Sequence, residues 1–157
     1  MISRAYTRCR YGQMHYREAA PENPTAPTLI LLHQNPSSSY EYELLMKAVS
    51  KDRRVIAFDT PGYGMSDAPP APLDMAAYAA SFSDAIDNLQ VEGKIDVYGF
   101  HTGTLLAIEL ALLRRDKVGR IALTGIPMYP PAKRADLLRQ IKEGPENDEQ
   151  GTVTLSM

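Results

Sequence analysis

The residues best suited to chemistry form a Gly-x-His-x-Gly motif, which consists of Gly99, His101 and Gly103. A buried-strand pattern at 95–98 runs into this motif, and a helix-forming run at 104–113 follows it at once. Flanking glycines allow a strained central residue to project its side chain above a sheet, and histidine is enriched at positive φ. A neutral imidazole held there can act as a general base on water or attack an acyl group directly. The alternative is that His101 is a packed or ligand-contacting residue without chemistry.

A second candidate element is the His-Gln-Asn-Pro loop at 33–36, which follows an aliphatic strand pattern at 28–32. Backbone N–H groups near Asn35 and at Thr102 are expected to form an oxyanion hole, as at an acyl-transfer site. Gln34 is expected to contact the substrate, and its side chain could also crowd the oxyanion hole. The alternative is that these loops only serve folding and open the next helix.

The other polar residues do not complete a catalytic triad. His15 falls in an expected hairpin and has no sequence context typical of a general base. Asp59 lies in a turn-rich loop, where we expect it to organise the backbone, and no carboxylate follows the strand pattern at 121–123. One cysteine, Cys9, and three scattered histidines match no spacing typical of a metal site. We therefore expect no bound metal and no cofactor.

Alternating strand and helix patterns predict the scaffold that would position these residues. They predict a hairpin within 5–18, strands at 28–32, 55–58, 95–98 and 121–123, and helices between the strands. The first helix has apolar residues at helical spacing, namely Tyr40, Leu44, Leu45, Ala48 and Val49. The helix after His101 is apolar nearly all round, so we expect it to be buried on several sides. Four strands separated by three helices favour a doubly wound, mainly parallel α/β sheet, with the candidate loops at its carboxyl edge.

The composition limits the classes of partner. The chain has 157 residues, which suits one domain, and its formal charge of −2 with no basic run disfavours nucleic acid. Its longest apolar stretch, 104–113, contains Glu109 and is shorter than the ~20 residues of a membrane helix. A single cysteine and the absence of an apolar leader predict a cytoplasmic location. We expect a small-molecule substrate, no nucleic acid and no membrane as partners.

Three motifs, in order, resemble those of the α/β-hydrolase superfamily, particularly its branch of haloalkane dehalogenases and epoxide hydrolases. The segment 33–39 is similar to the oxyanion loop of that family, and 58–67 is similar to its Asp-x-Pro-Gly-x-Gly-x-Ser segment. The segment 99–103 resembles the nucleophile elbow, with His101 in the place of the usual nucleophile. The resemblance also implies that His33 is a structural histidine that braces the oxyanion loop.

The resemblance covers the N-terminal portion of the family's catalytic domain. The later strands that carry the family's acid and its catalytic histidine have no counterpart in this sequence. The resemblance therefore implies a C-terminally truncated hydrolase-like core at 1–126, with 127–157 as the start of a cap helix and a disordered tail. Asn35 resembles the halide-binding asparagine of dehalogenases, but Thr102 stands where the family has a tryptophan. Halide chemistry is therefore not expected.

Two functions from different classes follow. The first is hydrolysis of an ester, an amide or a related small molecule, with His101 as the catalytic group. The second is that of a non-catalytic truncated remnant, or of a module that binds a small molecule or a protein. The strand at 121–123 would be an apolar edge of the sheet, so we also expect self-association through that edge.

Overall fold

The computed structural model describes residues 1–143, with side chains described as far as residue 139. In chain order, the elements are β1 (Ser3–Cys9), β2 (Gly12–Ala19), β3 (Thr28–Leu32), η1 (Ser39–Tyr42), α1 (Glu43–Val49), β4 (Val55–Phe58), α2 (Met75–Asn88), β5 (Ile95–Phe100), α3 (Thr102–Leu113), β6 (Val118–Thr124) and α4 (Pro131–Glu143). The chain divides into two compact units, 1–126 and 127–157. The tail that was expected to be disordered lies outside the described residues.

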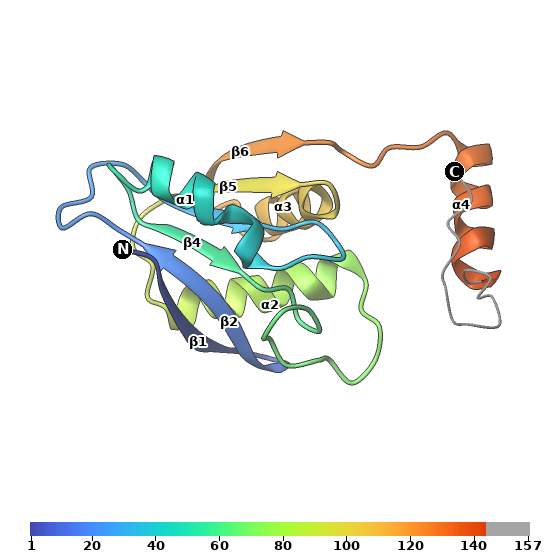
Figure 1. Cartoon of the computed structure of the whole chain (residues 1–157), viewed down its shortest axis with the longest axis horizontal. Helices are drawn as coiled ribbons and strands as arrows, with labels where there is room; N and C mark the ends of the chain where they lie inside the picture. The colour runs from blue at the N-terminus through green and yellow to red at the C-terminus, as the bar shows by residue number, and fades with distance from the viewer. Residues whose placement is uncertain (144–157) are drawn as a thin grey trace. The chain divides into compact units, whose positions relative to one another are not determined.

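The strands of the first unit form one sheet in the order β1-β2-β4-β3-β5-β6 (Figure 1). Strands β3, β4, β5 and β6 run parallel, while β1 and β2 form a hairpin whose second strand pairs antiparallel with β4. From β3 the chain crosses first to β4 on one side and then to β5 on the other. Such a reversal marks the place where α/β sheets bind ligands. The expected fold class, a doubly wound and mainly parallel α/β sheet, is confirmed.

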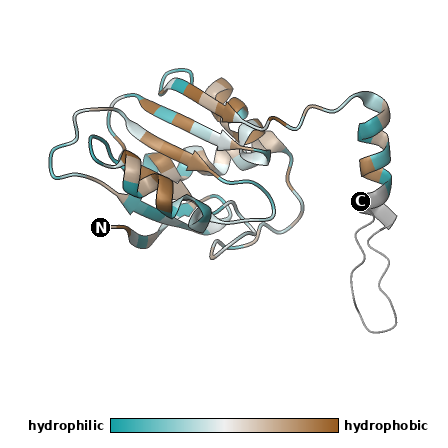
Figure 2. Cartoon of the chain, turned by 45° about the horizontal axis from the view of Figure 1, so that its top comes forward, coloured by the Kyte–Doolittle hydropathy of each residue, from teal (hydrophilic) through white to brown (hydrophobic). Residues whose placement is uncertain are grey.

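Helices cover both faces of this sheet. On one face, Leu31 and Ala57 pack with residues of η1 and α1, and on the other face α2 and α3 pack together against Ile30 and Ile56. The central strands are therefore buried on both sides, which explains their continuous aliphatic runs. In Figure 2, strands of the sheet carry long hydrophobic stretches, coloured brown.

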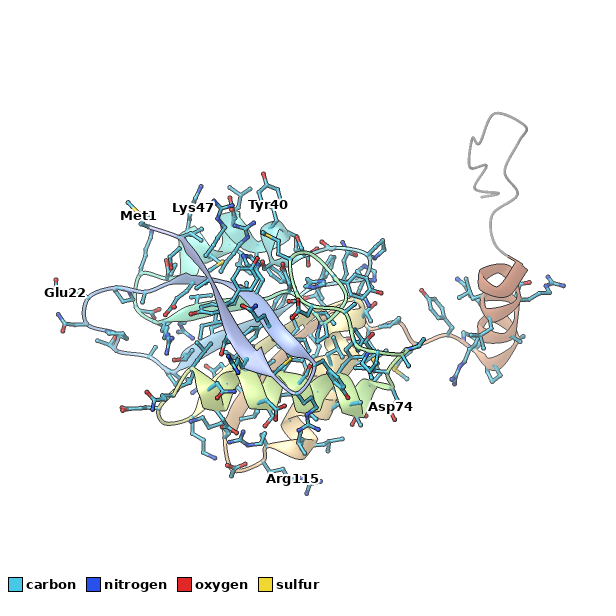
Figure 3. The ribbon with its side chains drawn as sticks, turned by 90° about the horizontal axis from the view of Figure 1, so that it is seen from below. Met1, Glu22, Tyr40, Lys47, Asp74 and Arg115 are labelled. Atoms are coloured by element: carbon cyan, nitrogen blue, oxygen red, sulfur yellow. The ribbon has the colours of Figure 1, made fainter. Side chains whose placement is uncertain are left out.

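The first helix differs from its expected pattern. Ser38 accepts a hydrogen bond from the Tyr40 N–H and opens the 3₁₀ helix η1, after which α1 begins. The buried apolar side chains of η1 and α1 are Tyr42 and Met46, whereas Tyr40 and Leu44 are exposed. Figure 3 shows Tyr40 at the surface. The expected apolar face is wrong at Tyr40, Leu44 and Ala48, which are exposed, because a 3₁₀ turn has about 3 residues rather than 3.6 and shifts the phase of the helix.

Helix α3 and strand β6 also differ from the pattern that the sequence predicts. Leu106 and Leu110 of α3 are buried, but Leu112 and Leu113 are each 52% exposed, so burial on several sides is wrong for the last turn. Strand β6 is longer than the expected 121–123. It pairs with β5 on one side, and no strand of residues 1–143 pairs with its other side.

Helix α4 belongs to the second unit. It begins at Pro131, a residue that suits the first position of a helix because it has no N–H to leave unpaired. Across residues 1–143, every helix is too short or too polar to cross a membrane.

Candidate functional site

His101 lies at the junction between β5 and α3, at the carboxyl end of the sheet. Its φ of 47° and ψ of −114° lie in a region that residues other than glycine rarely adopt. The His101 N–H donates to the Thr124 carbonyl at 2.9 Å, and the His101 carbonyl accepts the N–H and the hydroxyl of Thr104 at 2.9 and 2.6 Å. The strained turn is therefore fixed by β6 on one side and by the first turn of α3 on the other.

The two glycines of the motif make this close packing possible. A Cβ on Gly99 would lie 2.3 Å from the carbonyl oxygen of Gly103, and a Cβ on Gly103 would lie 2.0 Å from the carbonyl oxygen of Leu32. Both neighbours are backbone atoms, which cannot rotate away as a side chain can. Gly103 thus brings the start of α3 against the end of β3, beside the loop that begins at His33.

The imidazole of His101 is exposed and lies beside two other residues. Its ring centre is 4.5 Å from that of Phe100, in an edge-on arrangement. A Cβ on Gly125 would come within 3.2 Å of its Nε2, so the ring leans towards the end of β6. Within the part of the chain that the structure describes, no side chain forms a hydrogen bond with this imidazole. His101 therefore has no carboxylate to orient it there.

His33 is fully buried and joins two loops. The Thr60 N–H donates to its Nε2 at 2.9 Å, and its Nδ1 lies 2.7 Å from the Gln34 carbonyl oxygen. Because an amide N–H can only donate, Nε2 is the acceptor and Nδ1 carries the proton. His33 thus ties the loop after β3 to the loop after β4, in agreement with the bracing role that the family resemblance implied.

Gln34 and Asn35 are half-buried residues of the loop after β3. The Gln34 N–H donates to Glu41 Oε1 at 3.3 Å, and the Ser37 hydroxyl donates to Glu41 Oε2 at 2.7 Å. The side-chain oxygen of Asn35 is buried and has no partner within the described residues. In the same part of the chain, no hydrogen bond engages the backbone N–H of Asn35 or that of Thr102. These two amide N–H groups therefore have no acceptor within residues 1–143.

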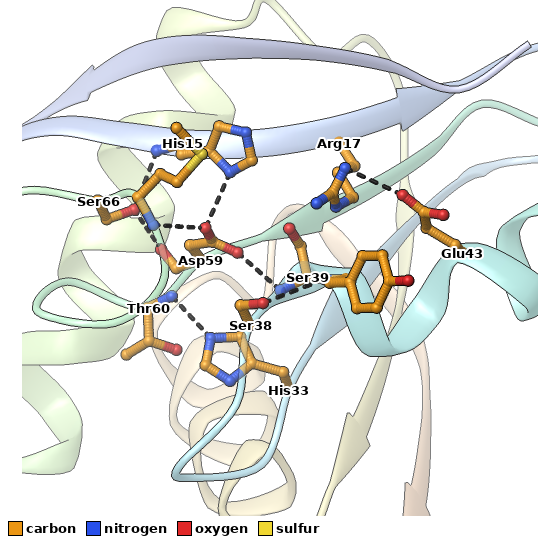
Figure 4. A network of polar contacts seen from close by, with 11 residues as sticks. His15, Arg17, His33, Ser38, Ser39, Glu43, Asp59, Thr60 and Ser66 are labelled. Carbon is orange, nitrogen blue, oxygen red and sulfur yellow. Dashed lines mark hydrogen bonds and ion pairs between the residues drawn. The ribbon is translucent and has the colours of Figure 1, made fainter.

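Asp59 is the centre of a buried polar network (Figure 4). Its Oδ1 accepts the Ser39 N–H at 2.6 Å, and its Oδ2 accepts the Met65 N–H at 2.9 Å and lies 2.9 Å from His15 Nδ1. Its backbone carbonyl accepts the Ser66 hydroxyl at 2.7 Å. The carboxylate therefore organises the loop after β4, as expected, and joins it to β2 and η1.

The charge of Asp59 is stabilised by these contacts. Burial alone would raise the pKa of Asp59, but hydrogen bonds from Ser39 and Met65, together with the nearby His15, bring the pKa below its ordinary value. The carboxylate is therefore the stable form at neutral pH. The carboxylate joins the loop after β4 to β2 and η1, and it does not contact His101.

The pairing of His15 with Asp59 was not expected from the sequence. In the antiparallel register of β2 with β4, Tyr16 lies opposite Phe58, so His15 lies opposite Asp59 as the next pair. Both side chains are 2% exposed. The sequence gives no signal for this register, although the turn motif did mark Asp59 as a structural residue.

The structure brings the candidate residues to one edge of the sheet without assembling a triad. The loop 33–36, Asp59 and His101 each follow a parallel strand, and Gly103 packs the turn at His101 against Leu32, where the loop 33–36 begins. No cluster of three metal-ligating side chains occurs in residues 1–143. A hollow of about 380 Å³ lies elsewhere, between the start of β1 and α1, and its lining residues are Met1, Ile2, Ala19, Glu43, Lys47 and Ser50.

Comparisons with known proteins agree with one another. A family described as alpha/beta hydrolase fold matches residues 27–154. The soluble epoxide hydrolase of Corynebacterium sp. (strain C12) is 32% identical over 109 residues, which cover 69% of this chain and 36% of that protein. A haloalkane dehalogenase of Mesorhizobium japonicum is 34% identical over 108 residues, covering 67% of this chain and 33% of that protein.

A solved structure shows the same arrangement. The haloalkane dehalogenase DbeA from Bradyrhizobium elkani matches with a TM-score of 0.75 at 28% identity, over 88% of this chain and 50% of that one. The chain thus spans about a third of the length of the two curated relatives and half of this structure.

Proposed function

Because the chain belongs to the alpha/beta hydrolase fold family, we propose that the carboxyl edge of its sheet is a site that hydrolyses an ester, an amide or a related small molecule. The observation that supports this most is the position of His101. Its imidazole is exposed, carries no internal hydrogen bond in the described chain, and is presented by a strained turn between a parallel strand and a helix. Strain of this kind is concentrated at functional sites.

In the proposed reaction, the unprotonated ring nitrogen of His101 attacks the acyl carbon of the substrate, and the carbonyl electron pair moves onto oxygen. When this oxyanion collapses, the bond to the leaving group breaks, and the leaving group takes the proton of the imidazolium. Water then attacks the acyl-imidazole, releases the acid and restores the ring. In the other route, the same nitrogen removes a proton from water while the water oxygen bonds to the acyl carbon. When the resulting oxyanion collapses, the bond to the leaving group breaks, and the imidazolium gives its proton to the leaving group.

The backbone N–H groups of Asn35 and Thr102 are proposed to bind the oxyanion in both routes. Each is unengaged within the described residues, and each lies on an element that follows a parallel strand. Preformed amide donors stabilise developing charge because they need not reorganise during the reaction. Gln34 is proposed to contact the substrate from the same loop. We also propose that 127–143 is the beginning of a cap segment.

Turnover of a p-nitrophenyl ester tests this function. Wild type and Cys9→Ala are expected to release nitrophenolate at the same slow rate, whereas His101→Ala is expected to lose that rate. Cys9 is the matched control because it is the chain's other strong nucleophile. His101→Asn serves as a second variant, since asparagine tolerates positive φ and has no imidazole. Equal rates in all of these proteins would refute a catalytic His101.

The second candidate function is a non-catalytic module that binds a small molecule or a protein. It is favoured by the absence, within residues 1–143, of any carboxylate that orients His101. In that case the amide analogue of the ester binds without turnover, and the NMR signals of His101 and Thr102 shift on titration. Loss of the Thr102 shift in His101→Asn, with no ester hydrolysis by wild type, would support binding over catalysis.

A further inference from the structure

We propose that Glu41, on the 3₁₀ helix η1, is the positioning residue that fixes the direction of the Asn35 N–H, one of the two proposed oxyanion donors. This role rests on the proposed function, because a fixed amide donor matters where an anion or an oxyanion binds. Glu41 lies outside the three segments that resemble family motifs, 33–39, 58–67 and 99–103. Its role therefore follows from the contacts of this chain alone.

The Glu41 carboxylate binds the loop on both sides of Asn35. Its Oε1 accepts the Gln34 N–H at 3.3 Å, and its Oε2 accepts the Ser37 hydroxyl at 2.7 Å. Gln34 directly precedes Asn35, and Ser37 follows it by two residues. An ionised acceptor makes such hydrogen bonds stronger than a neutral one does. One side chain thus holds both ends of the short segment that carries the donor.

Two side chains together set the direction of the Asn35 N–H. This N–H belongs to the same planar, trans peptide unit as the Gln34 carbonyl, so the two groups point in opposite directions. His33 Nδ1 donates to that carbonyl at 2.7 Å. Glu41 holds the N–H of the preceding peptide unit. Because the peptide units on both sides of the Gln34 Cα are held, the Asn35 N–H is left with one direction.

The same contact decides which amide of the loop is free. Of the Gln34 and Asn35 N–H groups, only that of Asn35 has no acceptor within residues 1–143. The other proposed donor, the Thr102 N–H, lies on α3, next to the strained turn at His101. Removal of Glu41 is therefore expected to disturb one donor of the pair and to leave the other in place.

The charge of Glu41 and its positioning role have opposite effects on an anion. A carboxylate repels an anion near it, so removal of the charge alone would strengthen anion binding. Loss of a fixed donor would weaken it. Glu43 provides the matched control, because it lies two residues further along and pairs with Arg17 Nη1 at 3.1 Å. Glu43→Ala removes a nearby charge of the same sign and keeps the contacts of Glu41 with the loop.

Titration of the full chain with acetate, followed by the amide NMR signal of Asn35, tests this role without turnover. Glu41→Ala is expected to raise the Kd for acetate at least about 10-fold, the loss of one hydrogen bond to a charged group. Glu41→Gln should bind like wild type, since its amide group can accept the Gln34 N–H and donate to the Ser37 hydroxyl. Glu43→Ala should bind acetate at least as tightly as wild type.

Two results of this titration would overturn the proposal. One is a Glu41→Ala protein that binds acetate as tightly as wild type or more tightly. The other is a wild type whose Asn35 signal does not respond to acetate. Hydrogen exchange of the Gln34 amide, which should be faster in Glu41→Ala than in Glu41→Gln, shows that the loop contact itself has been lost.

Hydrolysis of a p-nitrophenyl ester separates this role from the proposed function. Glu41→Ala should lower kcat about 10- to 100-fold and change KM by less than about 2-fold, because the oxyanion forms only after the substrate has bound. Glu41→Gln should restore most of kcat. An unchanged kcat in Glu41→Ala would remove the positioning role and leave hydrolysis standing. A wild type without turnover, whose acetate binding still weakens in Glu41→Ala, would remove hydrolysis and leave the positioning role standing.

Discussion

Replacement of Asp59 by asparagine is expected to destabilise the protein strongly. The Asp59 carboxylate accepts the N–H groups of Ser39 and Met65 and pairs with His15 Nδ1. Asparagine has a single acceptor oxygen, so its amide group must face one of these donors. Loss of one charge-assisted hydrogen bond costs about 1.5–3 kcal/mol, and an unpaired buried donor costs about 1–3 kcal/mol. The free energy of unfolding should therefore fall by about 4 kcal/mol.

Urea unfolding and thermal unfolding measure this loss. At about 2–4 °C for each kcal/mol, the melting temperature of Asp59→Asn should fall by roughly 8–16 °C. Asp67→Asn is the matched control, because Asp67 Oδ2 accepts the Gln13 N–H at 2.8 Å in the same loop but is exposed. Its loss should be about 1 kcal/mol or less. Equal losses in the two variants would refute the reasoning that burial makes the Asp59 contacts strong.

The pH dependence of stability gives a second readout for the same residue. The pKa of Asp59 is below its ordinary value in the folded protein, so its contribution to stability is complete above the unfolded-state pKa of about 4. That contribution is lost as the pH falls through the lower pKa of the folded state. Wild type should therefore lose stability more steeply in this acid range than Asp59→Asn, and parallel curves would count against the assignment.

Two further predictions concern the turn at His101. Gly103→Ala should lower the melting temperature by about 4–8 °C, since overpacking of about 3 kcal/mol outweighs the gain of about 1 kcal/mol in helix propensity. Gly119→Ala is the control, because its Cβ would have its nearest neighbour at 3.5 Å, and its melting temperature should be nearly that of wild type. Equal falls in melting temperature for the two variants would contradict the close contact between Gly103 and Leu32. Diethyl pyrocarbonate should modify His101 first, because His15 and His33 are 2% and 0% exposed. Peptide mass spectrometry that finds either buried histidine modified first would disprove this order.

The strands β3, β4 and β5 could be predicted to within two residues, whereas β6 begins three residues before the predicted 121–123. The runs at 28–32 and 55–58 match β3 and β4, because a strand buried on both faces reads as a continuous aliphatic run that ends in a turn. The position of the hairpin next to β4 could not be predicted, since strand pairing over long sequence distances leaves no local pattern. The contact between His15 and Asp59 depends on that pairing and was missed for this reason.

The candidate site was predictable in position and not in detail. The glycines at 99 and 103 indicated a tight turn at His101, which the backbone angles show. The direction of the His101 ring could not be predicted, because it depends on contacts with Phe100 and with Gly125, which follows β6. Glu41 accepts a hydrogen bond from the backbone N–H of Gln34. This contact depends on the 3₁₀ turn that changed the phase of the first helix, so it could not be predicted. The chemical roles of His101, Asn35, Thr102 and Gln34 remain predictions.

The strand order also has a consequence for synthesis on the ribosome. Strand β3 needs β4 on one side and β5 on the other, but β5 is completed only at Phe100. A nascent chain that has emerged only as far as β4 therefore presents the aliphatic segment 30–32 with one flank uncovered. Translation proceeds from the N-terminus, so this intermediate lasts while some forty further residues emerge. We expect chaperones that bind apolar strands to recognise the chain in this interval and to release it when β5 docks.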